Sequence, residues 1–195
     1  MRIDNGEHTR HPWRIDEIAP DFTLVDAWAI PASGTAAEFI HLHRLWWAEA
    51  PTTNDTGLSG GLFKIRDYLG RRLGWDDKIN TLPIPGSTKT SLRDRLPADL
   101  STETADRYER APFRPIYLTG NESAAELSNS ILHAVLHLGW APQPDGTYRG
   151  QLGVYVKHRG RLGRPYLMFI APFRHRIVYP ALMRRVDTAW KRRRA

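Results

Sequence analysis

Two histidines and two glutamates stand at spacings that could support acid–base or metal chemistry. His133 and His137 lie four residues apart in the apolar run SILHAVLHLGW, and Glu122 and Glu126 precede them with the same spacing. On a helix, two histidines four residues apart share a face and could coordinate a metal ion together. On a strand they would lie about 13 Å apart, at roughly 3.3 Å per residue, which is too far for a single ion.

The flanking residues favour the strand. With a two-residue hairpin turn at 129–130, Glu126 faces His133 and Glu122 faces His137, and such cross-strand pairs each contribute about 0.2–1 kcal/mol. The same pairing collects small and apolar residues on the opposite face: Ser123, Ala125, Leu127, Leu132, Ala134 and Leu136. A one-residue slip would mix the two faces, so the register is well specified. We therefore predict strands here and no metal site.

The next strand, TYRGQLGVYVKH, extends both faces. If Trp140 lies opposite Tyr148, then Tyr155 falls beside His133 on the polar face. Glu126, His133 and Tyr155 are thus the candidate catalytic residues, since a carboxylate that orients an imidazole is the arrangement of a general base. The alternative is a sheet surface that faces solvent or another subunit and is held together by hydrogen bonds. Both interpretations stay open.

The apolar face suggests a different kind of site. Small side chains opposite a long helix leave room that bulky aromatic residues could fill, as in an ordinary core, or that could form a cavity for an apolar ligand. If a cavity is present, we expect eight residues to line it: Trp28, Ser123, Ala125, Ala134, Leu136, Trp140, Phe169 and Phe173. The sequence leaves both outcomes open.

The elements that position these residues follow from periodicity and breakers. We predict an α+β fold in which an antiparallel sheet packs against helices. The first half is expected to contain an extended, loosely held arm over 1–20, a strand over 21–31 stopped by Pro31, a helix over 36–47, a loop over 51–61 and a second helix over 62–74. An ordered connection follows over 76–112, with a short helical piece at 91–100. The second half is expected to contain strands over 113–120, 122–129, 131–141 and 147–158, and then a long C-terminal helix that Pro180 should bend or break. Residues 21–195 are expected to form one domain after the arm.

Composition narrows the possible functions. The 195 residues contain no cysteine, which excludes disulfides, thiolate zinc sites and cysteine nucleophiles. The chain shows no secretory signal pattern and no apolar run of about 18 residues, so we expect a cytoplasmic protein without a transmembrane segment. It also lacks a GxGxxG fingerprint, a phosphate loop and a GxSxG elbow, and no cofactor is expected.

Charge is unevenly distributed. Residues 157–195 hold twelve Lys or Arg and one acid, a net charge of +11, whereas the first 156 residues carry sixteen basic and twenty acidic side chains, a net charge of −4. A basic C-terminus can contact nucleic acid or an anionic surface, through residues such as Arg184 and Arg185. The simpler explanation is that cations gather where a terminal helix ends. No base-reading element is recognisable, so nucleic acid is not the expected partner.

Three segments, PDFTLVDAWAIP, ESAAELSNSILHAVLHLGW and GRLGRPYLMFIAPFRHRIVYPALMRRV, resemble a bacterial family catalogued as a domain of unknown function, DUF2867. The resemblance covers about residues 20–190. That family is similar to the START-like and polyketide-cyclase-like (SRPBCC) proteins, whose helix-grip fold wraps an antiparallel sheet around a long C-terminal helix and a hydrophobic cavity. The resemblance brings no catalytic residues. It implies six strands, and the two not evident among the late ones are expected within 76–112.

These observations lead to ranked hypotheses for function. The first is binding of a small hydrophobic or amphipathic molecule between the sheet and the C-terminal helix. The second is a cyclase- or isomerase-type enzyme on the same scaffold. The third is a binder of nucleic acid or an anionic surface, and the fourth is a homodimer formed through the polar face of the sheet. Whether the chain is an enzyme is left open.

Overall fold

The computed structural model describes residues 1–50, 80–100, 108, 111–160 and 163–194. Within these ranges the chain forms a six-stranded antiparallel sheet in the order β1-β2-β6-β5-β4-β3. The strands are β1 (Arg2–Ile3), β2 (Thr23–Gly34), β3 (Arg114–Leu118), β4 (Glu122–Ser128), β5 (Leu132–Pro142) and β6 (Tyr148–His158). The helices are α1 (Asn5–Thr9), α2 (Arg14–Ile18), α3 (Phe39–Ala48), α5 (Gly163–Phe173) and α6 (Tyr179–Arg194), with short 3-10 turns at Ala36–Glu38 and Leu92–Arg95.

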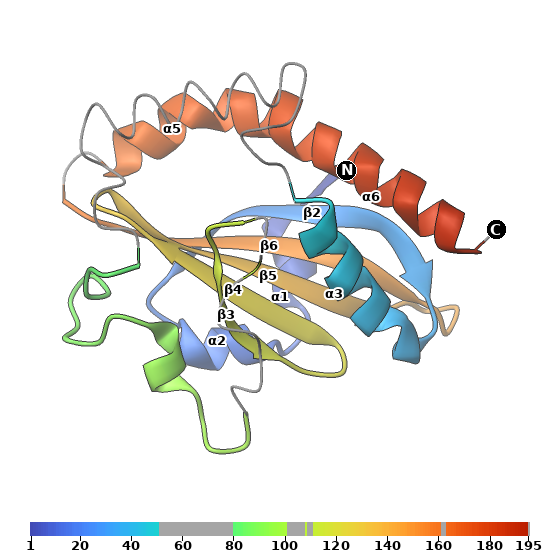
Figure 1. Cartoon of the computed structure of the whole chain (residues 1–195), viewed down its shortest axis with the longest axis horizontal. Coiled ribbons are helices and arrows are strands. Elements are labelled where there is room, and N and C mark those ends of the chain that lie inside the picture. The colour runs from blue at the N-terminus through green and yellow to red at the C-terminus, as the bar shows by residue number, and fades with distance from the viewer. Residues whose placement is uncertain (51–79, 101–107, 109–110, 161–162, 195) are drawn as a thin grey trace.

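This layout confirms the α+β class, the antiparallel sheet and the long C-terminal helix. The α5 and α6 helices form one rod along one side of the sheet, and α1 and α2 lie on the other side (Figure 1). The predicted loop over 51–61 and helix over 62–74 fall outside the described residues. No described helix is both long enough and apolar enough to cross a membrane.

The prediction of an extended, loosely held arm over residues 1–20 is wrong. Residues Arg2–Ile3 form the edge strand β1 against β2, and the Asp4 carboxylate caps α1 by accepting a hydrogen bond from the Gly6 amide at 2.8 Å. The side chains of Trp13 and Ile15 are almost completely buried against the sheet. The sixth strand of the sheet is therefore β1. The described part of 76–112 supplies no strand of the sheet.

Strand β2 continues past Pro31, which was expected to stop it. The register of β2 against β6 shifts between Ala29 and Ser33, so Pro31 lies where the hydrogen-bond ladder is already interrupted. A proline is tolerated at such an irregularity because it has no amide hydrogen to donate. A second shift separates Leu24 from Asp26.

The three late strands pair two residues away from the predicted register. Ser128 lies opposite His133, and Val135 lies opposite both Glu126 and Tyr155. The reason is a wider hairpin turn, in which the Asn129 side chain accepts hydrogen bonds from the amides of 131 and 132 at 2.9 and 3.0 Å. Because side chains alternate along a strand, a slip of two residues leaves every side chain on its predicted face.

The C-terminal rod stays continuous through Pro180. Between α5 and α6, residues Arg174–Val178 form one π-helical stretch, and the amide of Tyr179 donates to the carbonyl of Arg174. A π-turn is a recognised way for a helix to absorb an irregularity, and such turns occur often at functional sites. Of the two predicted outcomes at Pro180, a bend or a break, the break does not occur, and the helical irregularity lies directly before the proline.

Each face of the sheet has its own apolar cluster. On the side of α3, α5 and α6 the cluster contains seven buried aromatic side chains, five of which were expected to fill this space: Trp28, Phe39, Trp46, Trp47 and Trp140. On the other side, the N-terminal segment and residues 80–100 cover the sheet, with Trp13, Ile18, Ile84 and Leu92 among the buried residues. Both faces are thus covered by protein.

Candidate functional site

The polar face of the sheet contains the predicted glutamate–histidine pairs. The Nε2 atom of His133 lies 2.9 Å from the Glu126 carboxylate, and His137 Nε2 lies 2.9 Å from that of Glu122. Both imidazoles have no exposed surface. This face is therefore not the predicted solvent-exposed surface, since the N-terminal segment and residues 80–100 bury it, although the hydrogen bonds expected on it are present.

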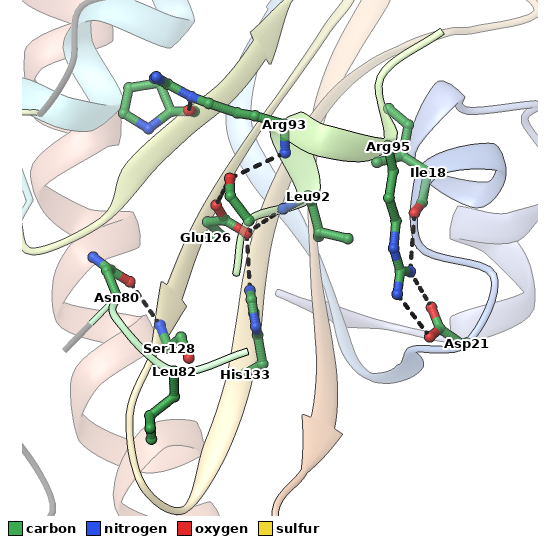
Figure 2. Close-up of polar contacts among 12 residues, drawn as sticks. Ile18, Asp21, Asn80, Leu82, Leu92, Arg93, Arg95, Glu126, Ser128 and His133 are labelled. Atoms are coloured by element: carbon green, nitrogen blue, oxygen red, sulfur yellow. Dashed lines mark hydrogen bonds and ion pairs between the residues drawn. The ribbon is translucent and has the colours of Figure 1, made fainter. Parts of the chain in front are cut away.

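The Glu126 carboxylate has hydrogen-bond partners on both of its oxygens (Figure 2). It accepts hydrogen bonds from the Ser91 hydroxyl at 2.5 Å, from the Leu92 amide at 3.0 Å and from His133. Burial raises the pKa of Glu126, but these hydrogen bonds outweigh it and hold the pKa below its usual range. The serine donates to the carboxylate and not to the imidazole, so this group is not a nucleophile–base relay.

Tyr155 does not join Glu126 and His133. The two-residue slip moves it toward His137, with ring centroids 6.3 Å apart, and its hydroxyl donates to Asp16 at 3.4 Å. Burial raises the pKa of Tyr155 far above the usual range. The predicted trio is thus divided between two networks, because a strand register decides which residues on one face become neighbours.

The second network contains His8, which the sequence did not single out. Its Nδ1 atom lies 2.9 Å from the Gln151 side-chain oxygen, and its Nε2 atom lies 3.1 Å from His137 Nδ1. Burial, followed by the nearby His137, lowers the pKa of His8 to about 3. His137 thus links His8 to the Glu122 carboxylate, which also accepts from the Tyr117 hydroxyl at 2.7 Å.

The eight residues predicted to line a ligand cavity lie in three different environments. Trp28, Ser123, Ala125 and Trp140 are buried, and Ser123 bonds to His43 Nδ1 at 2.9 Å. Ala134 and Leu136 are half-buried. Phe169 and Phe173 are 70% and 42% exposed. The structure therefore places four of the eight in the core, two at a partly accessible spot and two at the surface.

A charged cluster on this same side was missed by the sequence analysis. The carboxylate of Asp26, only 1% exposed, lies 2.6 Å from His175 Nε2 and 3.0 Å from the Arg174 guanidinium, and Arg2 approaches to 3.6 Å. The available signal was Asp26, the one acid within the run FTLVDAWAIP, which is otherwise almost entirely apolar. A buried carboxylate needs partners, and here they come from a helix about 150 residues later in the chain.

Two backbone irregularities meet at this cluster. Asp26 follows the bulge in β2, and Arg174 and His175 lie in the π-turn. Bulges and π-turns both redirect side chains and are over-represented at functional sites. The indole of Trp28 lies beside them, 5.9 Å from the His175 ring. The cluster therefore combines a fixed carboxylate, two guanidinium groups, and an imidazole that is 25% exposed.

The Asp26 cluster lies in the same cross-strand row as the half-buried Leu136. Asp26 pairs with Val154, Val154 with Leu136, and Leu136 with Ala125, so the four form one row across the sheet. Adjacent strands are about 4.8 Å apart, so Asp26 and Leu136 are roughly 10 Å from each other.

Comparison with known proteins gives one match. The model of the family described as "Protein of unknown function (DUF2867)" matches residues 18–181. No curated protein and no solved structure matches the chain. The matched range includes the strands β2 to β6, the cluster residues Asp26, Arg174 and His175, and α5, whereas Arg2 lies before it. Because that range covers most of the sequence, the chain belongs to the DUF2867 family.

Proposed function

We propose that the chain binds a small amphipathic molecule between the sheet and the C-terminal rod, in the manner of a helix-grip protein. The observation that carries the proposal is the partial exposure of Ala134 and Leu136 on the helix side of β5. This strand has neighbours on both sides, and its helix-side residues would be fully buried if the rod packed tightly everywhere. An apolar group could occupy the space that leaves them accessible.

The Asp26 cluster supplies the polar end of the proposed site. Two guanidinium groups and one carboxylate leave a net positive charge there, which favours an anionic head group. Trp28 and Tyr179, with ring centroids 5.0 Å apart, border the cluster with aromatic surface. Burial raises the pKa of Tyr179 to about 12, so its hydroxyl stays protonated.

The test uses anilinonaphthalene sulfonate, a probe with an aromatic body and an anionic sulfonate. We expect one probe per folded chain, Ala134→Phe to block binding by filling the space, and Arg174→Gln to weaken it about tenfold by removing a charged hydrogen bond. The control is Arg10→Gln, an exposed arginine on the N-terminal segment. Equal binding by all four proteins would refute the proposal. Native mass spectrometry of the purified protein would identify any ligand carried from the cell.

A cyclase- or isomerase-type enzyme is the second candidate. The observation that favours it is the pairing of the buried Asp26 with the partly exposed His175, which is how a carboxylate orients a general base. With a ligand identified by mass spectrometry, we expect His175→Asn to lower turnover about 100-fold while retaining binding. Unchanged turnover would exclude His175 as the base. Glu126 and His133 would need their closed face to open before they could take part.

A further inference from the structure

The outward face of the C-terminal rod has an apolar half. Five of the six exposed residues of α5 follow the helical spacing i, i+3, i+4, i+7, i+8 and so form one apolar stripe: Pro165, Met168, Phe169, Pro172 and Phe173. The sixth is Arg164, in the first turn of the helix. Met168 is 69% exposed and Phe169 is 70% exposed. Three of the four large hydrophobic side chains that are exposed among the described residues lie on this helix. Such a concentration of exposed apolar surface marks an interaction site.

The second half of the same face is cationic. Beyond the stripe, the exposed positions include Arg176, in the π-helical stretch, and Arg184, Thr188 and Arg192, which are spaced by four residues along α6. A hollow of about 420 Å³ opens beside them, lined by Glu49, Ala181, Arg184, Arg185, Thr188, Ala189 and Arg192. Glu49 is its one carboxylate against three guanidinium groups.

The last two arginines do not belong to this face. Arg193 and Arg194 fold over the Trp190 ring at 4.9 and 5.4 Å and pair with Glu38 at 2.7 and 3.2 Å. They attach the end of α6 to the turn before α3. The basic C-terminus predicted from composition is thus divided between an intramolecular contact and an outward-facing surface.

We propose that this outward face docks on an anionic lipid bilayer. The apolar half would enter the interface between head groups and acyl chains, and the arginines would pair with lipid phosphates, as in interfacial amphipathic helices. A second copy of the same face would bring like charges together, which disfavours a homodimer here. Single-stranded nucleic acid binders interleave aromatic residues with cations, whereas here, apart from Arg164, the exposed aromatic residues lie on α5 and the exposed arginines lie beyond it. The docking does not depend on a ligand in the sheet–helix space.

The first experiment measures sedimentation with vesicles of phosphatidylcholine alone or mixed with phosphatidylglycerol. We expect binding to the mixed vesicles only, weakened by salt because the arginine contribution is screened. Phe169→Ser/Phe173→Ser should lower the partition coefficient about tenfold or more, since two apolar contacts are lost. Arg176→Glu/Arg184→Glu should lower it by a similar factor. Arg10→Glu/Lys89→Glu carries the same charge change on the exposed opposite side and should bind as the unmodified chain does.

A second experiment reports insertion directly. The chain has no cysteine, so Met168→Cys and Thr88→Cys each give a single site for an environment-sensitive fluorophore. We expect the label at 168 to shift to the blue on mixed vesicles and the label at the exposed 88 to stay in water. Equal signals at both sites would overturn the proposal. So would binding that depends on the arginines but not on the phenylalanines, since that indicates electrostatic adsorption only. Capture of a DNA oligonucleotide or formation of a dimer, without vesicle binding, would also overturn it.

Discussion

The two faces of the sheet contain similar chemical groups in opposite situations. On the N-terminal side, two carboxylates and three imidazoles are buried, hydrogen-bonded and closed to solvent. On the side of the rod, one carboxylate is equally buried, but its imidazole and guanidinium partners reach the surface. The polar side-chain atoms of the first set are paired except for His133 Nδ1, which is buried without a hydrogen-bond partner, and the set stabilises one arrangement of the chain. The second set is accessible from solvent.

This difference shows why residue types alone mislead. His133 with Glu126 and His175 with Asp26 are the same pair of groups at 2.9 and 2.6 Å. Only the second pair lies where backbone irregularities and solvent access coincide. Accessibility, which depends on what covers each face, separates a structural pair from a functional candidate.

The strongest test of the closed face removes one of its carboxylates. Glu126→Leu would leave the Ser91 hydroxyl, the Leu92 amide and His133 without their acceptor. We expect the free energy of unfolding to fall by about 3–5 kcal/mol in urea titrations, because these groups stay buried and unpaired. Glu126→Gln keeps an acceptor and should cost less. If the leucine variant were as stable as the parent chain, this network would have no structural role.

A smaller loss is expected where the N-terminal segment meets the sheet. A side chain at Gly139 would place its Cβ 2.7 Å from the Trp13 ring, whereas one at Gly120 would have nothing within 4 Å. Gly139→Ala should therefore lower the free energy of unfolding by about 1–3 kcal/mol through overpacking. Gly120→Ala should change it by less than about 0.5 kcal/mol. Equal values from thermal melts would mean that Trp13 does not cover the sheet in solution.

On the side of the rod, acid should weaken the fold through His43. Burial lowers the pKa of His43 to about 4, below its unfolded value of 6.5. The stabilisation is present above pH 6.5 and is lost as the pH falls toward 4, by about 1.4 kcal/mol per pH unit. His43→Leu should remove this share of the slope in chemical denaturation at several pH values. The exposed His41 on the same helix provides the control, His41→Leu.

The smallest effect is expected at the end of α6. Arg193 pairs with Glu38 at 2.7 Å, and both side chains are partly exposed. Arg193→Ala should cost at most about 1 kcal/mol, since solvent screens such pairs. A loss comparable to that of Glu126→Leu would show that the C-terminal contact is as important as the closed face. Urea titration of both variants under one condition makes the comparison.

Much of the fold was predictable because the late strands alternate so regularly. The sorting of Glu126 and His133 to one face and of Ala125 and Ala134 to the other is confirmed, even though the register is two residues off. The turn could not be predicted because it depends on how the Asn129 side chain satisfies two amides. Of the residues expected to line a cavity, Phe169 and Phe173 are instead exposed on α5. The Asp26 cluster was missed because its members are far apart in the sequence.

Local alternation and composition determined the element types, the face of each strand residue and the asymmetry of charge, because these depend only on near neighbours and residue counts. The tertiary structure alone decided that residues 1–20 cover the polar face of the sheet. It also decided which of the carboxylate-paired imidazoles reaches solvent, and that the outer surface of α5 is apolar. Burial is a property of what packs against a residue. For His133 and His175 the packing partners come from distant segments, so no local pattern could reveal their different accessibility.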